Sequence, residues 1–216
     1  MTLVRRCPTF PSMFRPTKII GIGVNYRAHA VEMGKGLPEE PLMFLKPPSA
    51  LILDGAAIER PAGYERVDYE GELGVVIGRR AKRVTRERAL EVVAGFTCVN
   101  DVTVRDLQKK DGQWARAKGF DTFCPVGPRI VPGLDPSRLK IQTRVNGVVK
   151  QDSTTADLIF DVPALIAFVS AHVTLEEGDL ITTGTPSGVG NLAVGDVVEI
   201  EIEGIGVLKN PVIARP

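Results

Sequence analysis

Short runs of apolar and β-branched residues recur along the whole chain, and many of them alternate with polar positions. Such alternation is typical of strands with one buried face, whereas a short continuous apolar run is typical of a strand inside a core. The pair Asn146-Gly147 separates two of these runs and favours the two-residue turn of a β-hairpin. The pattern predicts strands over residues 18–24, 42–46, 68–77, 96–102, 140–145, 148–151, 179–183, 196–203 and 206–212.

Three other segments, residues 25–33, 85–94 and 161–173, have the composition and end signals of helices. Thr85 is a candidate N-cap, and Pro163 lies close to the start of the third helix, where proline is tolerated. Strands therefore outnumber helices, and the two do not alternate regularly. This order predicts an α+β, mostly β domain in the form of a folded sheet or sandwich.

The chain has 216 residues, of which 44% are hydrophobic and 25% charged, and its formal net charge is +1. We expect residues 1–16 to form an N-terminal arm and residues 17–216 to form one globular domain. The near-zero net charge creates no global field toward nucleic acids or membranes, and no apolar run approaches the ~18 residues of a membrane span. The cysteines Cys7, Cys98 and Cys124 are too widely spaced for a disulfide framework or a CxxC zinc site, so we expect a reducing, cytoplasmic location.

A cluster of basic residues follows the strand predicted over residues 68–77. Acidic residues lie nearby, and no aromatic side chain that could stack on a base stands among them. Charge runs of this kind are usually a solvated turn and helix face, so we expect no nucleic-acid binding. The cluster consists of Arg79, Arg80, Lys82, Arg83, Arg86 and Arg88.

Glu70 and Glu72 stand two positions apart in a predicted strand, so both side chains point to one side of it. Two carboxylates this close repel each other, and burial adds a desolvation cost. A divalent cation removes both penalties, and ligands that are all oxygen favour Mg²⁺, Mn²⁺ or Ca²⁺ over zinc. Asp101, which follows the apolar run 96–99, is a third candidate ligand. The alternatives are a solvated strand face for the glutamates and a turn-forming role for Asp101.

Three further residues are candidates for proton transfer and charge stabilisation. His29 and Glu32 are three positions apart on a predicted helix and can share a face, and an imidazole held by a carboxylate is suited to act as a general base. Lys118, expected in a glycine-containing loop, is suited to neutralise an enolate or a carboxylate. The alternatives are a surface ion pair and a solvated lysine. His172, in an apolar helix, is expected to be a packed residue.

Residues 182–190, with the sequence TTGTPSGVG, follow a predicted strand and are rich in hydroxyl groups, glycines and free backbone N–H groups. A loop of this composition can bind a carboxylate. It contains no Gly-Lys-Ser/Thr, so it is not a Walker loop. The Gly21-x-Gly23 segment has Tyr26 where a dinucleotide fingerprint requires glycine, which excludes Rossmann-type binding.

Seven segments of the chain resemble, in the same order, motifs of the fumarylacetoacetate hydrolase family. They cover nearly all of residues 17–216, and seven motifs in order are far more specific than one. The resemblance is to the short members, which lack the large N-terminal domain of the eukaryotic hydrolase. The segments are GIGVNYRAHAVEM (21–33), FLKP (44–47), DYEGELGVVIG (68–78), GFTCVNDVTVRDLQ (95–108), KGFDTFCPVGP (118–128), VNGVVKQDSTTADLIF (145–160) and GDLITTGTPSGVG (178–190).

The resemblance implies a folded β-roll, usually in a homodimer, and a Mg²⁺ or Mn²⁺ site with Glu70, Glu72 and Asp101 as ligands. His29 and Glu32 match the pair that activates water in hydrolytic members, on a segment that often becomes an ordered lid when substrate binds.

Other matched positions concern the substrate. Lys118 matches the active-site lysine, and Thr185, with the adjacent Gly184, matches the loop that holds the substrate carboxylate. Polar positions near the pocket are matched by Arg105, Gln108 and Gln151.

These matches imply an enzyme that acts on a small 2-oxo or enol carboxylate through a metal-stabilised enolate. The presence of both His29 and Glu32 favours hydrolysis of a C–C bond in an acylpyruvate. One alternative is an isomerase of 2-hydroxyhepta-2,4-diene-1,7-dioate, or a decarboxylase of 5-oxopent-3-ene-1,2,5-tricarboxylate or oxaloacetate, in the catabolism of aromatic compounds. A second alternative is a non-catalytic relative that binds a metal or ligand, although all the residues whose loss would favour it are present.

Overall fold

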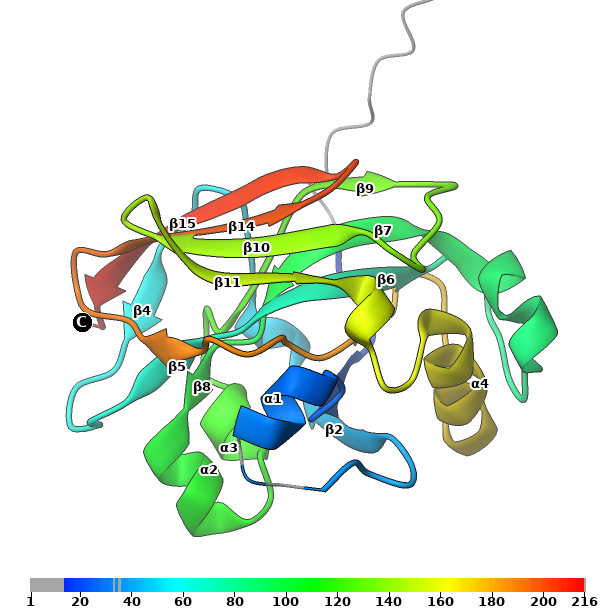
Figure 1. The fold of residues 1–216 in the computed structure, drawn as a ribbon, viewed down its shortest axis with the longest axis horizontal. Helices are drawn as coiled ribbons and strands as arrows, with labels where there is room; N and C mark the ends of the chain where they lie inside the picture. Colours follow the sequence, from blue (N-terminus) through cyan, green and yellow to red (C-terminus); the bar gives the residue numbers. More distant parts are fainter. Residues whose placement is uncertain (1–13, 33, 35, 216) are drawn as a thin grey trace, which may run out of the picture.

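The structure is a computed structural model that describes residues 14–32, 34 and 36–215. Its strands form three sheets, and a few short helices surround them, so the fold class expected from the sequence pattern is confirmed (Figure 1). Of the arm expected over residues 1–16, only residues 14–16 are among those described.

The largest sheet has seven strands in the order β2-β1-β12-β6-β7-β9-β3. They are β1 (Ile19–Gly23), β2 (Leu42–Lys46), β3 (Leu51–Leu53), β6 (Gly71–Ile77), β7 (Val93–Asn100), β9 (Cys124–Val131) and β12 (Leu180–Thr182). The central strand β6 is buried along its whole length. On one face, Leu73, Val75 and Ile77 join the main core cluster with Ile200 and Leu165 from other elements. A strand covered on both faces reads as a nearly continuous apolar run, as this one does.

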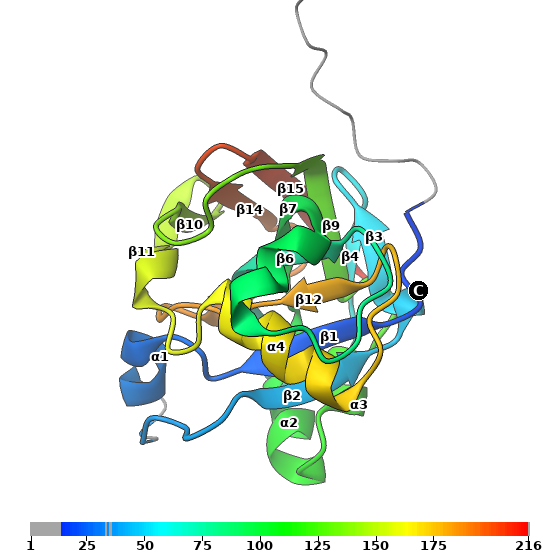
Figure 2. The same cartoon turned by 90° about the vertical axis from the view of Figure 1, so that its right-hand side faces the viewer.

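The second sheet has five strands in the order β11-β10-β14-β15-β4 and packs over the first (Figures 1 and 2). They are β4 (Ile58–Arg60), β10 (Lys140–Val145), β11 (Val148–Thr154), β14 (Val197–Ile202) and β15 (Gly206–Ala214). The hairpin predicted around Asn146 and Gly147 is confirmed as β10–β11, and both turn residues have positive φ, as the primed turn requires. A third sheet, in the order β13-β5-β8, contains β5 (Val67–Tyr69), β8 (Thr103–Val104) and β13 (Gly190–Asn191).

The strand predicted over residues 68–77 is interrupted at Glu70. β5 pairs with β8 and β13 in the third sheet, whereas β6 pairs with β12 and β7 in the first. The chain therefore changes sheets between Tyr69 and Gly71, and Glu70 lies at this junction. A strand that changes sheets keeps its alternating sequence pattern, so the pattern alone gives no sign of the break.

The helices are α1 (Arg27–Glu32), α2 (Arg105–Asp111), α3 (Ala115–Lys118) and α4 (Val162–His172), with 3-10 helices η1 (Pro48–Ala50), η2 (Arg86–Val92) and η3 (Thr155–Asp157). The helix predicted over residues 85–94 is the 3-10 helix η2. Figure 2 shows α4 lying across the first sheet, and the side chain of Asp161 caps it by accepting a hydrogen bond from the Ala164 N–H at 3.0 Å.

Two sequence expectations about helices need correction. Lys118 ends α3 instead of lying in a loop, because the sequence before it forms an unpredicted single turn. His172 is exposed at the end of α4, where its ring lies against Phe168, and is not a packed residue. The whole of α2 was also missed, since Leu107 is its one buried residue and it has no apolar period.

Candidate active site and metal centre

A cavity of about 560 Å³ is lined by residues from α1, α2, α3 and the start of β6. Eight of the eleven site residues expected from the sequence line it: His29, Glu70, Glu72, Asp101, Arg105, Gln108, Lys118 and Thr185. The other three lie behind the wall, each hydrogen-bonded to a residue that lines it: Glu32 to His29, Gly184 to Glu72 and Gln151 to Thr185. The fold therefore brings all eleven positions to one place.

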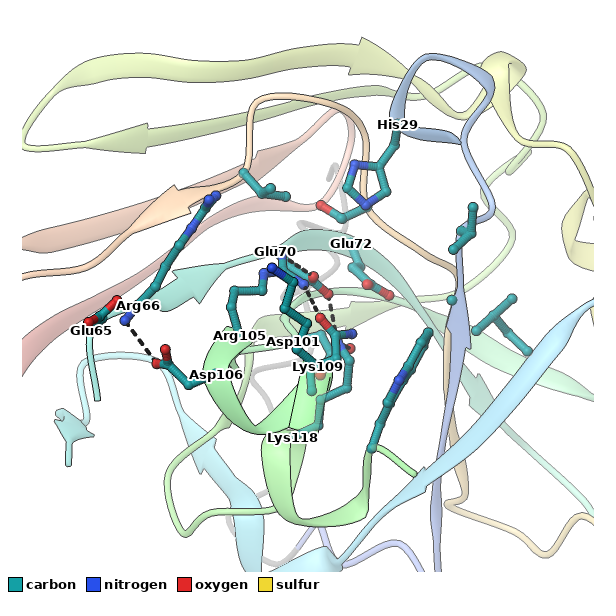
Figure 3. Close-up of a pocket in the computed structure, with 17 residues that line it drawn as sticks. His29, Glu65, Arg66, Glu70, Glu72, Asp101, Arg105, Asp106, Lys109 and Lys118 are labelled. Atoms are coloured by element: carbon teal, nitrogen blue, oxygen red, sulfur yellow. Dashed lines mark hydrogen bonds and ion pairs between the residues drawn. The ribbon is translucent and has the colours of Figure 1, made fainter. Parts of the chain in front are cut away.

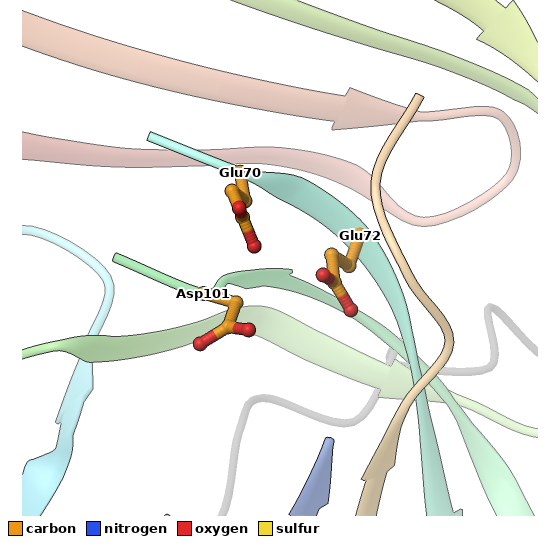
Figure 4. A group of neighbouring side chains, drawn as sticks. All are labelled: Glu70, Glu72 and Asp101. Atoms are coloured by element: carbon orange, nitrogen blue, oxygen red, sulfur yellow. The ribbon is translucent and has the colours of Figure 1, made fainter. Parts of the chain in front are cut away.

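Three carboxylates meet at the inner end of this cavity. Glu70, Glu72 and Asp101 each offer one oxygen, and these oxygens all lie within 4.8 Å of one another (Figure 4). All three residues are at most 4% exposed. Antiparallel pairing of β6 with β7 sets Gly71 opposite Asn100, and the Asp101 N–H donates to the Glu70 carbonyl at 2.9 Å. Strand register therefore brings together residues that are some thirty positions apart.

Gly71, between the two glutamates, occupies a position with no room for a side chain. A Cβ there would lie 2.1 Å from Oγ1 of Thr143 and 3.2 Å from Oε1 of Gln151. Its backbone N–H donates to Gln151 Oε1 at 3.0 Å, and its carbonyl accepts from the Thr185 hydroxyl at 2.9 Å. Glycine is thus required for β10 and β11 to pack against the strand that presents the two carboxylates.

Two buried lysines hold two of the three carboxylates. Lys118 Nζ donates to Glu70 Oε2 at 2.8 Å, to Asp101 Oδ2 at 2.6 Å and to Thr103 Oγ1 at 2.7 Å. Lys46 Nζ donates to Asp101 Oδ1 at 2.5 Å and to the Phe123 carbonyl at 2.8 Å. Lys46 was not singled out in the sequence, although it lies in the FLKP segment, because its distance along the chain from Asp101 gave no sign of contact.

The pKa values of the two glutamates shift in opposite directions. Burial would raise the pKa of Glu70, but the charges of Lys118 and Arg105 outweigh it and lower that pKa to about 2. Burial, reinforced by the charges of Asp101 and Glu70, raises the pKa of Glu72 well above its ordinary value. At Lys118, the negative charges of Asp101 and Glu70 outweigh burial and raise the pKa of the side chain, so the ammonium remains charged.

The donor set fits a hard divalent cation. The converging ligand atoms are all carboxylate oxygens, which suits Mg²⁺ or Mn²⁺ and not a zinc site of nitrogen or sulfur ligands. Glu72 accepts one hydrogen bond, from the Gly184 N–H at 2.7 Å, and has no cationic partner of its own among the described residues. The charge of a buried carboxylate that has no ion-pair partner is the charge that a bound metal ion would compensate.

Arg105 connects the carboxylates to a further buried acid. Its Nε donates to Asp68 Oδ2 at 2.7 Å, one terminal nitrogen lies 2.6 Å from Glu70 Oε1, and the other donates to Gln108 Oε1 at 2.8 Å. Asp68 is fully buried and also accepts from Nε of Arg66 at 2.8 Å. Sequence reasoning missed Asp68, whose signal was an acid two positions before Glu70 on the same side of the strand.

His29 lies on the wall of the cavity opposite the helix α2, as Figure 3 shows. The residue is 5% exposed, and its Nδ1 lies 2.8 Å from Glu32 Oε2. The other carboxylate oxygen of Glu32 accepts a hydrogen bond from the Gly188 N–H at 3.1 Å, so α1 is attached to the loop over residues 183–189. These contacts fix the direction of the imidazole ring.

The loop that includes Gly184 and Thr185 is held by the same network. Gly184 has a φ of +97°, and its N–H is taken by Glu72. The Thr185 hydroxyl donates to the Gly71 carbonyl and accepts from Gln151 Nε2 at 2.8 Å. Of the three residues expected to contact substrate from this region, Thr185 alone faces the cavity, and Gln151 and Gly184 support it from behind.

The curled, mostly β fold and the three carboxylates at the end of its cavity are those of an enzyme family that acts on small carboxylates. Residues 18–213 match the family described as fumarylacetoacetate (FAA) hydrolase C-terminal. The chain therefore belongs to the fumarylacetoacetate hydrolase family, as the resemblance of its motifs implied.

Individual relatives within the family differ in their named reactions. The chain is 52% identical to 5-carboxymethyl-2-hydroxymuconate delta-isomerase from Mycobacterium smegmatis, with a TM-score of 0.88 over 93% of this chain and 80% of that one. It is 45% identical to oxaloacetate tautomerase YisK of Bacillus subtilis, over 92% of this chain and 70% of that protein. It is 38% identical to maleylpyruvate hydrolase from Sphingobium sp. SYK-6, solved in complex with manganese(II) and pyruvate, with a TM-score of 0.82 over 93% and 72% of the two chains.

None of the helices in the described part of the chain has the length and apolar character needed to cross a membrane.

Proposed function

We propose that this chain is a divalent-metal-dependent enzyme that moves a proton at the carbon next to the 2-oxo group of a small carboxylate, as a keto–enol tautomerase or isomerase. The observation that carries the proposal is the convergence of Glu70, Glu72 and Asp101 within 4.8 Å beside Lys118. Similarity to a named isomerase and a named oxaloacetate tautomerase supports this choice among the reactions of the family.

The three carboxylates are suited to hold Mg²⁺ or Mn²⁺, and a manganese complex of a relative supports that assignment. When bound, the cation supplies Lewis-acid stabilisation of negative charge on the 2-oxo oxygen. Lys118 adds a second positive charge at the same end of the cavity. Because its pKa is raised, Lys118 acts as a fixed charge that stabilises the enolate and not as a base.

In this proposal His29 accepts and returns the proton. Its ring lines the cavity, and Glu32 orients it through the 2.8 Å contact to Nδ1, which leaves Nε2 to face the substrate. Thr185 contacts the carboxylate of the substrate, while Gly184 and Gln151 position the loop. Arg105 and Gln108, joined by a hydrogen bond, form the side of the pocket toward the distal half of the substrate.

Hydrolysis of a C–C bond in an acylpyruvate is the second candidate. The His29–Glu32 pair favours it, because an imidazole held by a carboxylate can equally take a proton from water. Similarity to a maleylpyruvate hydrolase supports the same reading. Both reactions pass through an enolate at the inner end of the cavity, so the metal-binding residues serve either.

Parallel assays with three substrates separate these functions. Purified protein with Mg²⁺ or Mn²⁺ is given enol-oxaloacetate, 2-hydroxyhepta-2,4-diene-1,7-dioate and an acylpyruvate, and the enol absorbance and the products are followed. We expect the wild type to turn over enol-oxaloacetate, 2-hydroxyhepta-2,4-diene-1,7-dioate or both. The Glu70→Gln variant should turn over neither substrate. Cleavage of the acylpyruvate alone would favour the hydrolase, and unchanged turnover in Glu70→Gln would remove the metal centre from the mechanism.

The homodimer expected from the family remains a prediction. It is supported by exposed apolar side chains, Leu42 and Leu45, on the edge strand β2 of the first sheet. Size-exclusion chromatography with light scattering tests it directly.

A further inference from the structure

A second cavity, of about 350 Å³, lies outside the proposed active site and is lined by the turn after β6 and by η2, beside α4 (Figures 1 and 2). It shares no lining residue with the cavity that holds the carboxylates, because its walls follow Ile77 at the end of β6, whereas Glu72 lies at the start of that strand. We propose that this second cavity, called here the basic cavity, binds the phosphate groups of a small phosphorylated compound, with diphosphate as the unit recognised. Its positively charged lining residues are Arg79, Arg80, Lys82, Arg83 and Arg88.

The acids around the basic cavity do not balance these cations. Glu91, the one carboxylate among the lining residues, is shared by Arg79 at 3.2 Å and Arg88 at 3.0 Å. Arg80 pairs with Glu176 at 3.2 Å. Every side chain in these pairs is at least 38% exposed, so the pairs are weak and can be exchanged for a bound anion. Within the described part of the chain, the five cations therefore pair with only two carboxylates.

Lys82 and Arg83 carry the surplus charge. Both residues are exposed, and neither side chain forms an ion pair or a hydrogen bond with any described residue. A helix C-terminus attracts cations, and α4 ends nearby at His172, but that attraction amounts to a fraction of a charge and is confined to the last turn. It accounts for one cation in this turn and not for a surplus of several, whose mutual repulsion a bound anion would relieve.

The backbone of the turn is fixed before any ligand arrives. Ala81 and Leu175 exchange two hydrogen bonds, at 2.8 and 2.9 Å. The Arg83 N–H donates to the Ser170 carbonyl at 2.8 Å, and the Val84 N–H donates to the Ser170 hydroxyl at 2.9 Å. These bonds attach the turn to the end of α4 on both sides of Lys82, so binding an anion orders side chains only, which lowers its entropic cost.

Arg83 has a backbone conformation that normally selects a different residue. Its φ is +51°, in the left-handed region that glycine and asparagine favour. A longer side chain that is kept in such a conformation points to a role for that side chain. The described residues give the Arg83 guanidinium no partner within the protein, so its role is to meet a group from outside.

The chemistry of the basic cavity fits a phosphate group. Guanidinium groups bind phosphate oxygens in bidentate pairs, and a diphosphate carries enough negative charge to balance the surplus. The volume of about 350 Å³ lies within the range of small-molecule sites. No aromatic side chain is among the lining residues, so a base has no surface on which to stack, which agrees with the absence of nucleic-acid binding expected from the sequence.

Calorimetric titration of the full-length protein tests this site. Inorganic diphosphate is added without divalent cations, which it would chelate, and citrate is the comparison because it carries a similar charge on carboxylates. We expect saturable binding of one diphosphate per chain, about 10-fold tighter than that of citrate and weaker as salt rises.

Arg83→Gly separates binding from folding. The variant should lose about 5-fold or more of the affinity for diphosphate, because it removes an unpaired guanidinium. Its Tm should not fall, since glycine adopts a φ of +51° without strain. Lys82→Gln should weaken diphosphate binding in the same direction, by about 2-fold. Lys109→Gln is the matched control, because it removes an exposed lysine from the other cavity, and it should leave diphosphate binding unchanged.

Three results would overturn the proposal. Citrate that binds as tightly as diphosphate would show a patch that attracts any anion. Equal losses of affinity in Lys109→Gln and Arg83→Gly would place the diphosphate elsewhere or nowhere in particular. A phosphate group can also belong to a lipid, so the protein is sedimented with vesicles of phosphatidylserine and phosphatidylcholine, and we expect it to stay in the supernatant. Sedimentation with the vesicles that is lost in Arg83→Gly would assign the cavity to a lipid headgroup instead of a small compound.

Discussion

The inner end of the cavity and its mouth are made of different elements. At the inner end, Glu70, Glu72 and Asp101 lie on or beside paired strands, and Lys46 and Lys118 hold two of them in place with both ammonium groups buried. At the mouth, α2 presents side chains that are partly or fully exposed, including Asp106 and Lys109, whereas His29 on α1 is buried. The difference indicates that the metal-binding carboxylates are fixed by the sheets, whereas the other lining residues depend on short helices.

Substitution of a carboxylate at the inner end should have the largest effect. Asp101→Asn removes the acid that both lysines contact, which takes a ligand from the cation and leaves two buried ammonium groups with less compensation. We expect kcat/KM to fall by about 10³-fold or more and calorimetric Mn²⁺ binding to be lost. Asp106→Asn at the mouth is the matched control and should retain Mn²⁺ binding. Equal loss of the metal in both variants would remove the distinction between the two regions.

The helix α1, which carries His29, should govern turnover without governing metal binding. His29→Gln removes the proposed proton acceptor while the carboxylates remain, so kcat should fall by about 10²–10³-fold with unchanged Mn²⁺ affinity. Glu32→Gln should cost less, about 10-fold, because Glu32 orients the ring and does not face the substrate. His172→Gln, at the other histidine of the chain, should be neutral because that residue is exposed on α4. A normal kcat in His29→Gln would exclude it as the base.

The close packing of the inner end should appear as a loss of stability. In Gly71→Ala the new methyl group meets Thr143 Oγ1 of β10, and the second sheet must move away from the strand that presents the glutamates. Overpacking of this kind costs about 2 kcal/mol, which lowers Tm by about 4–8 °C in a chain of this size. Gly36→Ala is the control, since nothing lies within 4 Å of the added Cβ. A similar Tm for both variants would show that β6 and β10 adjust without strain.

The sequence predicted the inner end better than the mouth, for a physical reason. Glu70 and Glu72 share one side of a strand by local geometry, so alternation alone placed these two carboxylates together. The surrounding strands β1, β2, β10, β11 and β14 were predicted for the same reason. The motif resemblance, and not the local pattern, added Asp101, which follows the neighbouring strand β7.

Long-range contacts and short elements were not predictable in this way. Lys46 reaches Asp101 across 55 positions of sequence, and Asp68 meets Arg105 across 37. Neither contact leaves a periodic signal. Helix α2 has one buried residue, so its sequence looks like a polar loop, and the place of Lys109 at the mouth emerged only from the fold. Motif resemblance supplied Arg105 and Gln108, which the local pattern did not.

The smallest expected effect concerns Glu70 and Glu72 at the inner end. It tests whether these two residues contribute alike to the stability of the folded protein. In the metal-free protein, Glu70 is compensated by Lys118 and Arg105, whereas Glu72 is not. Glu72→Gln should therefore stabilise the metal-free protein by about 1 kcal/mol, raising Tm by about 2–4 °C, because the amide is uncharged and can still accept from the Gly184 N–H. Glu70→Gln should lower Tm, since it leaves two cations with less negative charge.

The dependence on pH should distinguish these two residues further. The raised pKa of Glu72 means that the folded protein holds a proton that the unfolded chain releases, so this residue reduces stability as pH rises above its ordinary value of 4.5. For Glu70 the folded pKa of about 2 lies below that value, so its contribution is complete above 4.5 and is lost as pH falls toward 2. Thermal melts of both variants in chelator from pH 2 to 8 measure the two slopes, that of Glu70 below pH 4.5 and that of Glu72 above it. Saturating Mn²⁺ at about 100 times its Kd should then stabilise the wild type by about 2.7 kcal/mol and Glu72→Gln by much less. A metal-free Glu72→Gln protein less stable than wild type at neutral pH would show that Glu72 is already compensated without a cation, and the strongest physical reason for a metal at this site would be gone.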